Sequence, residues 1–84
     1  MNSRLGNRLH IIYLFDAYGE LLTTRQQRLM RQYYHDDLSL GEIAERLRIT
    51  RQAVSDSLHR SVGELARFER HLGLVRQRTA GEPG

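Results

Sequence analysis

The side chains best suited to binding chemistry gather on the outward face of one expected helix, near the middle of the chain. Arginine and glutamine occur there at helical spacing, and each pairs bidentately with a base edge, arginine with guanine and glutamine with adenine, for roughly 1–3 kcal/mol of discrimination. Hydroxyls at expected helix N-termini could add hydrogen bonds to phosphate beside the free backbone amides. The candidate binding residues are Ser39, Thr50, Arg51, Gln52, Ser55 and His59.

A protein or ribonucleoprotein partner is the second interpretation of the same face. Asp56 lies among the candidate residues, and an exposed carboxylate repels phosphate, although it can accept a hydrogen bond from cytosine. A surface of mixed arginine and acid suits a protein of complementary charge. Four tyrosines would either add an interface patch or pack in the core with their hydroxyls at the surface. They are Tyr13, Tyr18, Tyr33 and Tyr34.

Residues suited to catalysis are not arranged in any comparable way. The four histidines are scattered over different expected helices. Asp16 and Glu20 are four residues apart, which makes them a like-charge pair on a helix surface. The His-Asp-Asp run at 35–37 could bind a metal, but three consecutive residues rarely converge on one ion. We therefore expect no enzyme activity, no metal site and no cofactor.

Two helices joined by a short turn are expected to position the candidate face. Apolar residues at helical spacing give the first helix, 39–47, one buried face. Thr50 is a suitable N-cap for the second helix, whose inward residues would include Val54 and Leu58. Such a pair, at 39–62, is a helix-turn-helix, in which the second helix projects outward and can enter a groove.

The turn between these helices has particular steric demands. Ala44 is small, as two helices that cross steeply require, and Ile49 would fill the corner between them. Arg48 stands where a left-handed residue is expected, at a cost on the order of 1 kcal/mol for a residue other than glycine. Ser39 and Glu42 have the spacing of a capping box at the start of the first helix.

Two further helices are expected before the helix-turn-helix. The first would span 7–18, and the second would begin after Thr23 and end at 35–37. Thr23 and Gln26 repeat the capping-box spacing. The fold class is therefore all-α, with four to five helices.

The apolar pattern continues past the helix-turn-helix to about residue 72. Gly63 lies inside this pattern, where glycine destabilises a helix by ~1 kcal/mol relative to alanine. It would either stay within one long helix or divide the helix in two. The apolar stripe needs a surface to pack on, either the first helix or a second subunit, and so favours a homodimer. We expect a single domain at 7–75, with a flexible segment at 1–6 and a disordered tail at 76–84.

The composition fits one small domain, or part of an oligomer, and excludes a membrane-spanning chain. The 84 residues are 39% hydrophobic and contain no long apolar run, so we expect neither a membrane span nor a signal peptide. Without cysteine there is no disulfide and no thiolate metal site, which suits a cytoplasmic protein.

The positive charge is modest and evenly spread along the sequence. All 13 basic side chains are arginines, and the formal net charge is +3. Arginines exceed acidic residues by one in each of the segments 1–38, 39–62 and 63–84. A strong nucleic-acid binder usually concentrates its positive charge, so this distribution counts against tight nonspecific DNA binding.

Two stretches of the sequence carry a resemblance to a known family. The first is 14–18 followed by 21–23, and the second is 33–45 followed by 50–56. Over about residues 9–75 the chain resembles the YlxM family of small bacterial proteins, whose helix-turn-helix is similar to region 4 of sigma factors.

The resemblance implies an all-helical cytoplasmic protein, often dimeric, with a regulatory role in the signal recognition particle pathway. Such a protein would bind the particle's GTPase or its RNA. The alternative is a sequence-specific DNA-binding transcriptional regulator. A homodimer would form through the C-terminal helix.

Overall fold

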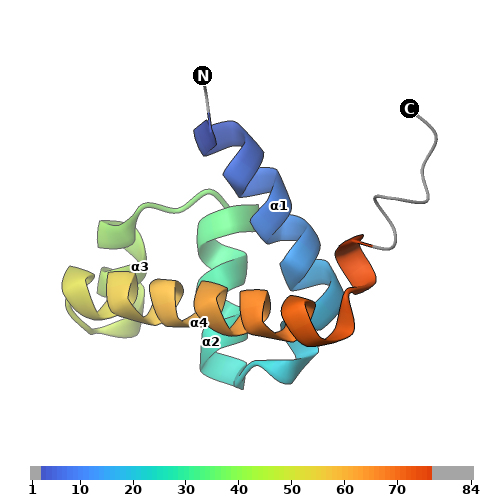
Figure 1. The fold of residues 1–84 in the computed structure, drawn as a ribbon. Coiled ribbons are helices and arrows are strands. Elements are labelled where there is room, and N and C mark those ends of the chain that lie inside the picture. The colour runs from blue at the N-terminus through green and yellow to red at the C-terminus, as the bar shows by residue number, and fades with distance from the viewer. Residues whose placement is uncertain (1–2, 77–84) are drawn as a thin grey trace.

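The chain folds into a set of packed helices, and the computed structural model describes residues 3–76, with side chains from residue 8 onward. No strand occurs among these residues, so the all-α class with a helix-turn-helix is confirmed. The short 3-10 helix η1 follows α1, and the π-helical turn η2 continues α2 without a break. In chain order (Figure 1) the elements are α1 (Ser3–Tyr18), η1 (Gly19–Leu21), α2 (Thr24–Met30), η2 (Arg31–His35), α3 (Leu40–Leu47) and α4 (Arg51–Leu72).

Side-chain caps start α2, α3 and α4. The expected capping box at α2 is present: Gln26 N donates to Thr23 Oγ1 at 3.1 Å, and Thr23 N donates to Gln26 Oε1 at 3.0 Å. Ser39 and Glu42 make the same pair of bonds at α3, at 3.1 and 2.9 Å. Thr50 Oγ1 accepts an amide of the first turn of α4 at 3.0 Å. Each cap satisfies donors that the first helical turn leaves without a partner.

The turn between α3 and α4 has the predicted geometry. Arg48 is left-handed, with φ 58° and ψ 44°, and it ends α3. Ala44 is buried at the helix contact, and its carbonyl accepts a hydrogen bond from Ile49 N at 3.0 Å. Ile49 is half-buried and packs against the core, as expected for the residue at the corner.

One apolar core joins all four α-helices. Val54 and Leu58 face inward, as predicted, and Tyr18 is 1% exposed. Tyr33 and Tyr34 are half-buried and pack edge to face, with ring centroids 4.9 Å apart. The buried core residues are Leu14, Phe15, Tyr18, Leu22, Leu29, Met30, Ile43, Ala44, Val54, Leu58, Leu65 and Val75.

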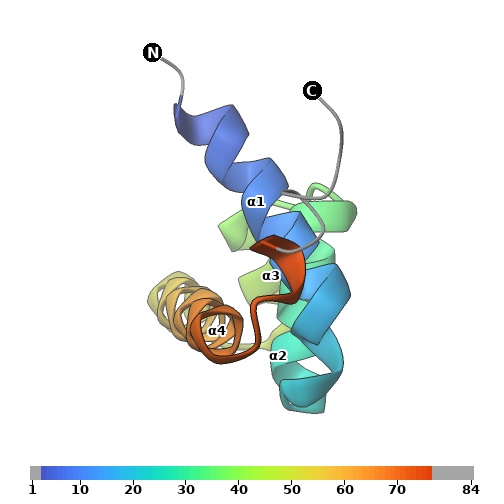
Figure 2. The same ribbon diagram turned by 45° about the vertical axis from the view of Figure 1, so that its right-hand side comes forward.

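The long helix α4 lies across one side of the other helices. In Figure 1 it crosses α2, and in Figure 2 it is seen nearly along its axis, with the other helices to one side of it. Val54, Leu58 and Leu65 bury its inward face. The opposite face of α4 therefore points away from the rest of the described structure.

The helix boundaries differ from the expectations at two points, and the structure decides the question left open at Gly63. α1 begins at Ser3 rather than at residue 7. Gly63 does not divide α4: it is exposed, and the helix ends only at Gly73, which is left-handed with φ 65°. Helical residues resume at 74–76, and the rest of the expected tail lies outside the described residues. No helix in the described part of the chain is long and apolar enough to cross a membrane.

Buried polar contacts join the end of α1 to the end of α4. Tyr18 Oη donates to Glu69 Oε1 at 2.6 Å and accepts from Leu74 N at 2.9 Å. The Glu69 carboxylate also accepts from the amides of Val75 at 3.1 Å and Arg76 at 2.9 Å. Glu69 thus caps the helical residues 74–76 and holds the segment after Gly73 against α1.

These contacts shift both ionisations. Burial, and then the hydrogen bond to Glu69, raise the pKa of Tyr18. The hydrogen bond from Tyr18, followed by those from the backbone amides, lowers the pKa of Glu69.

Part of the C-terminal apolar stripe is accounted for within the chain, because Leu65 and Val75 are buried in the core.

Candidate nucleic-acid interface

The helix-turn-helix fixes the first half of α4 rigidly enough to present a defined surface. Ile43 and Ala44 of α3 pack in the same core as Val54 and Leu58 of α4. Ser61 is also buried, and it satisfies its hydroxyl within α4 by donating to Ser57 O at 2.8 Å. The rotation of α4 about its axis is therefore set by its buried side.

At the N-terminus of α4, an arginine lies beside the positive end of the helix dipole. Thr50 caps it, and the first turn contains no acidic residue. Arg51 is exposed, and its Nε lies 3.7 Å from the position that a Cβ on Gly41 would take. The arginine side chain therefore extends across the start of α3, toward the segment that holds Ser39.

Ser39, in contrast, stands beside a negative charge. Its hydroxyl oxygen accepts the Glu42 amide, and its own amide donates to the Glu42 carboxylate. The pKa of Glu42 is lowered, chiefly by that backbone hydrogen bond. A carboxylate held at this helix end opposes a phosphate, so of the two predicted N-cap hydroxyls only Thr50 faces a favourable charge environment.

Gln52 forms a hydrogen bond within α4 rather than presenting a free amide. Its Nε2 donates to Asp56 Oδ1 at 2.9 Å, one turn further along the exposed face. A glutamine that pairs with adenine uses both the NH₂ group and the carbonyl oxygen of its side chain. Base reading by Gln52 would therefore require this bond to break.

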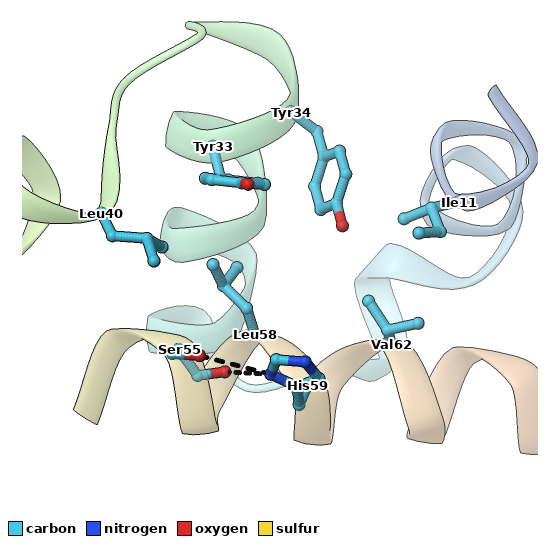
Figure 3. A pocket seen from close by; sticks show the side chains of 8 residues that line it. All are labelled: Ile11, Tyr33, Tyr34, Leu40, Ser55, Leu58, His59 and Val62. Atoms are coloured by element: carbon cyan, nitrogen blue, oxygen red, sulfur yellow. Dashed lines mark hydrogen bonds between the residues drawn. The ribbon is translucent and has the colours of Figure 1, made fainter. Parts of the chain in front are cut away.

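Ser55 and His59 lie to one side of the exposed face, next to a hollow. His59 Nδ1 is 2.8 Å from Ser55 O and 3.4 Å from Ser55 Oγ. The hollow, about 280 Å³ in volume, opens between α1, η2, the start of α3 and α4, as Figure 3 shows. Its lining residues are Ile11, Tyr33, Tyr34, Leu40, Ser55, Leu58, His59 and Val62.

Unpaired arginines near the turn were not among the predicted site residues. Arg46 and Arg48 are exposed, and the one ion pair among the described residues joins Arg8 and Asp37, at 3.5 Å. Both arginines lie within five residues of Arg51 in sequence. The signal was present in the sequence as a local excess of arginine, but pairing with nearby acids could have cancelled it.

The His-Asp-Asp run at 35–37 is exposed in the structure. Within it, His35 packs its ring against Phe15, with centroids 5.9 Å apart. Within residues 3–76 no group of three or more histidine or acidic side chains is placed to hold an ion. The candidate face described above offers arginine, a helix N-terminus and polar side chains, which are groups suited to binding phosphate.

Comparison with known proteins agrees with this architecture. A UPF0122 protein of Desulforamulus reducens is 56% identical over 62 residues, which cover 74% of this chain and 53% of that protein. A UPF0122 protein of Geobacillus kaustophilus is 45% identical over 73 residues, or 87% of this chain and 66% of that protein. A UPF0122 protein of Listeria innocua is 46% identical over 71 residues, which cover 84% of this chain and 63% of that protein.

The chain spans about half to two thirds of the length of these curated relatives. Residues 5–82 match a family model described as "Putative helix-turn-helix protein, YlxM / p13 like". Because this match covers nearly the whole sequence, the chain belongs to the YlxM/p13-like helix-turn-helix family, UPF0122.

Proposed function

We propose that this chain is a regulatory nucleic-acid-binding protein of the bacterial cytoplasm, which places the N-terminal half of α4 against a phosphate backbone. The observation that carries the proposal is the start of α4, where a threonine cap and an acid-free first turn meet the exposed guanidinium of Arg51. Aligned peptide dipoles add partial positive charge at that end, and phosphate is a favourable ligand there.

The RNA of the signal recognition particle is the partner that we propose first, and the particle's GTPase is the protein partner of the same proposal. The resemblance to the YlxM family supports this pathway. The side-chain contacts support an RNA duplex: Gln52, Ser55 and His59 bond within α4, which leaves few groups to read bases. Duplex RNA is recognised mainly by its shape and its phosphates.

A sequence-specific DNA-binding regulator is the second candidate, and one observation favours it. Arg51 is free at the start of a projecting helix, where it could pair with guanine for roughly 1–3 kcal/mol of discrimination. Competition between a mixed-sequence DNA duplex and duplexes enriched for a bound site would separate the two candidates, because a backbone binder shows little preference among them.

A pull-down from lysate of the source organism tests the proposed partner. The tagged protein is recovered from nuclease-treated and untreated lysate, with protein identified by mass spectrometry and nucleic acid by sequencing. We expect to recover the signal recognition particle RNA and the particle's GTPase from untreated lysate, and neither of them after nuclease treatment. Discrete DNA fragments without either component would instead support the transcriptional regulator.

Arg51→Ala tests the proposed site. The variant should bind duplex nucleic acid more weakly and with a shallower salt dependence, because one phosphate contact is lost. Its melting temperature should not change, since Arg51 is exposed and makes no ion pair in the described structure. Arg31→Ala is the matched control, an exposed arginine on η2. Equal affinities for the two variants would refute the contact.

The proposed homodimer would form through the end of α4. Leu72 and Leu74 are 53% and 50% exposed, and a second copy would bury them. Sedimentation of the wild-type protein and of Leu72→Gln tests this proposal. A dimer that the substitution dissociates is the expected result, and a wild-type monomer at every concentration would exclude it.

A further inference from the structure

The part of α4 from the last turn of the helix-turn-helix to the helix C-terminus carries a basic face that sequence counting does not reveal. Arg60, Arg67 and Arg70 are all exposed. At 100° per residue they fall within about 80° of one another around the helix, on the side opposite the buried residues. We call these three side chains the arginine stripe. His59 and His71 flank it, and Gly63 lies in its middle without a side chain.

The acids of the same segment are turned away from the arginine stripe. Glu64 accepts a hydrogen bond from Gln26 of α2, at 3.3 Å. Glu69 is bound by Tyr18 of α1 and by two backbone amides. Both carboxylates are therefore directed toward the neighbouring elements. Between residues 60 and 70 the fold thus leaves one side of α4 with arginine as its only charged residue type, and the exposed Asp56 lies one turn before Arg60.

The guanidinium groups of the arginine stripe are not neutralised within the described structure. The only ion pair among residues 8–76 is that of Arg8 with Asp37. Arg67 lies over the ring of its neighbour Phe68, with its Cζ 6.0 Å from the centroid, which orients the group without cancelling its charge. Three full positive charges therefore face solvent along one side of α4.

The chemistry of this face fits a phosphate backbone better than a protein surface. Protein interfaces are built around a buried apolar centre. The exposed large apolar side chains of the described residues are Leu9, Tyr13, Leu21, Leu72 and Leu74, so none lies within the arginine stripe. The ten residue steps from Arg60 to Arg70 span about 15 Å of helix. That length is similar to a B-DNA major groove, which is about 12 Å wide.

We infer that the arginine stripe is a second contact surface for the phosphodiester backbone of a nucleic-acid duplex. It extends the footprint of α4 beyond the helix-turn-helix. The inference rests on the proposed function, because it takes the start of α4 as the first contact. Arginine suits the role since its planar group pairs bidentately with phosphate. The duplex is recognised by the charge and the spacing of its phosphates, and its bases need not be read.

Salt-dependent binding by charge-removing variants tests the arginine stripe. The probes are labelled mixed-sequence DNA and RNA duplexes two helical turns long, titrated from about 50 to about 200 mM salt. Arg67→Gln should reduce the slope of log affinity against log salt by about 0.9 on the DNA duplex, and the double variant with Arg70→Gln by about 1.8. Arg31→Gln, which removes the same charge elsewhere, should leave the slope unchanged.

A charge-restoring variant separates a lost contact from a damaged fold. Arg67→Lys combined with Arg70→Lys should recover most of the slope, and the glutamine variants should melt as the wild type does, since both positions are exposed. The tighter of the two duplexes identifies the nucleic acid that is bound.

Three outcomes would overturn the inference, and they are distinguishable. No binding of either duplex by the wild type would refute the proposed function as well. Duplex binding that Arg51→Ala weakens and the double glutamine variant does not would refute the arginine stripe alone. Binding of polyglutamate as tight as duplex binding would also contradict it, because the surface would then be a general site for polyanions.

Discussion

Replacing Gly63 with alanine should stabilise the protein, because Gly63 lies inside a continuous 22-residue helix. A Cβ built at this position has no atom within 4 Å, so alanine introduces no clash. Glycine in a helix interior is less favourable than alanine by roughly 0.5–1 kcal/mol, because it loses more backbone freedom on folding. For a domain of this size, 1 kcal/mol raises the melting temperature by about 4–8 °C.

Thermal and urea unfolding followed by circular dichroism measure this effect. Gly73→Ala is the matched control: nothing clashes with its Cβ either, but its φ of 65° is left-handed. That substitution should destabilise the protein by roughly 1–2 kcal/mol. If Gly63→Ala lowers the melting temperature instead, then α4 bends at Gly63 and our account of one rigid helix is wrong.

Three further substitutions test the core, the contact between Tyr18 and Glu69, and the exposed face of α4. Val54→Asp should abolish cooperative unfolding, because a charge buried without a partner costs several kcal/mol against a total of about 5–15 kcal/mol; a wild-type melt would refute the core assignment. The pKa of Glu69 is lower folded than unfolded, so its stabilisation is complete above the unfolded value of 4.5 and is lost as the pH falls below it. Glu69→Gln should therefore flatten the acid limb of a melting-temperature profile, and an unchanged limb would show that the Tyr18–Glu69 joint is not formed. Asp56→Asn should strengthen duplex binding severalfold in an anisotropy titration, because it removes a like charge beside the phosphates while keeping an acceptor for Gln52; weaker binding would place Asp56 in a direct contact with the partner.

The local features of the fold were predictable because they depend on residues close in sequence. Both capping boxes join residues three apart, and each pair of side chains reaches only its own helix end. The left-handed turn at Arg48 and the buried Ala44 likewise follow from short spacings within the motif. The same reasoning left Gly63 undecided, because whether it bends a helix depends on what packs around it.

The surface chemistry was less predictable because it depends on partners far apart in sequence. Glu64 is bound by a residue 38 positions away, and Glu69 by one 51 positions away. Counting charges along the chain treats these carboxylates as equal to exposed ones, so it misses the one-sided arginine stripe. The bonds of Gln52 and His59 within α4 have ordinary helical spacing, but the spacing alone does not say which rotamer forms.

The central claim is that α4 binds a nucleic-acid duplex through its phosphates, and salt titration of the wild-type chain tests it most directly. We propose one phosphate contact for each of four arginines, Arg51, Arg60, Arg67 and Arg70. They predict a slope of log affinity against log salt of about −3.6 on a DNA duplex. A steep negative slope near that value would support the account. Affinity that does not change with salt, or no binding of either DNA or RNA duplex, would contradict it.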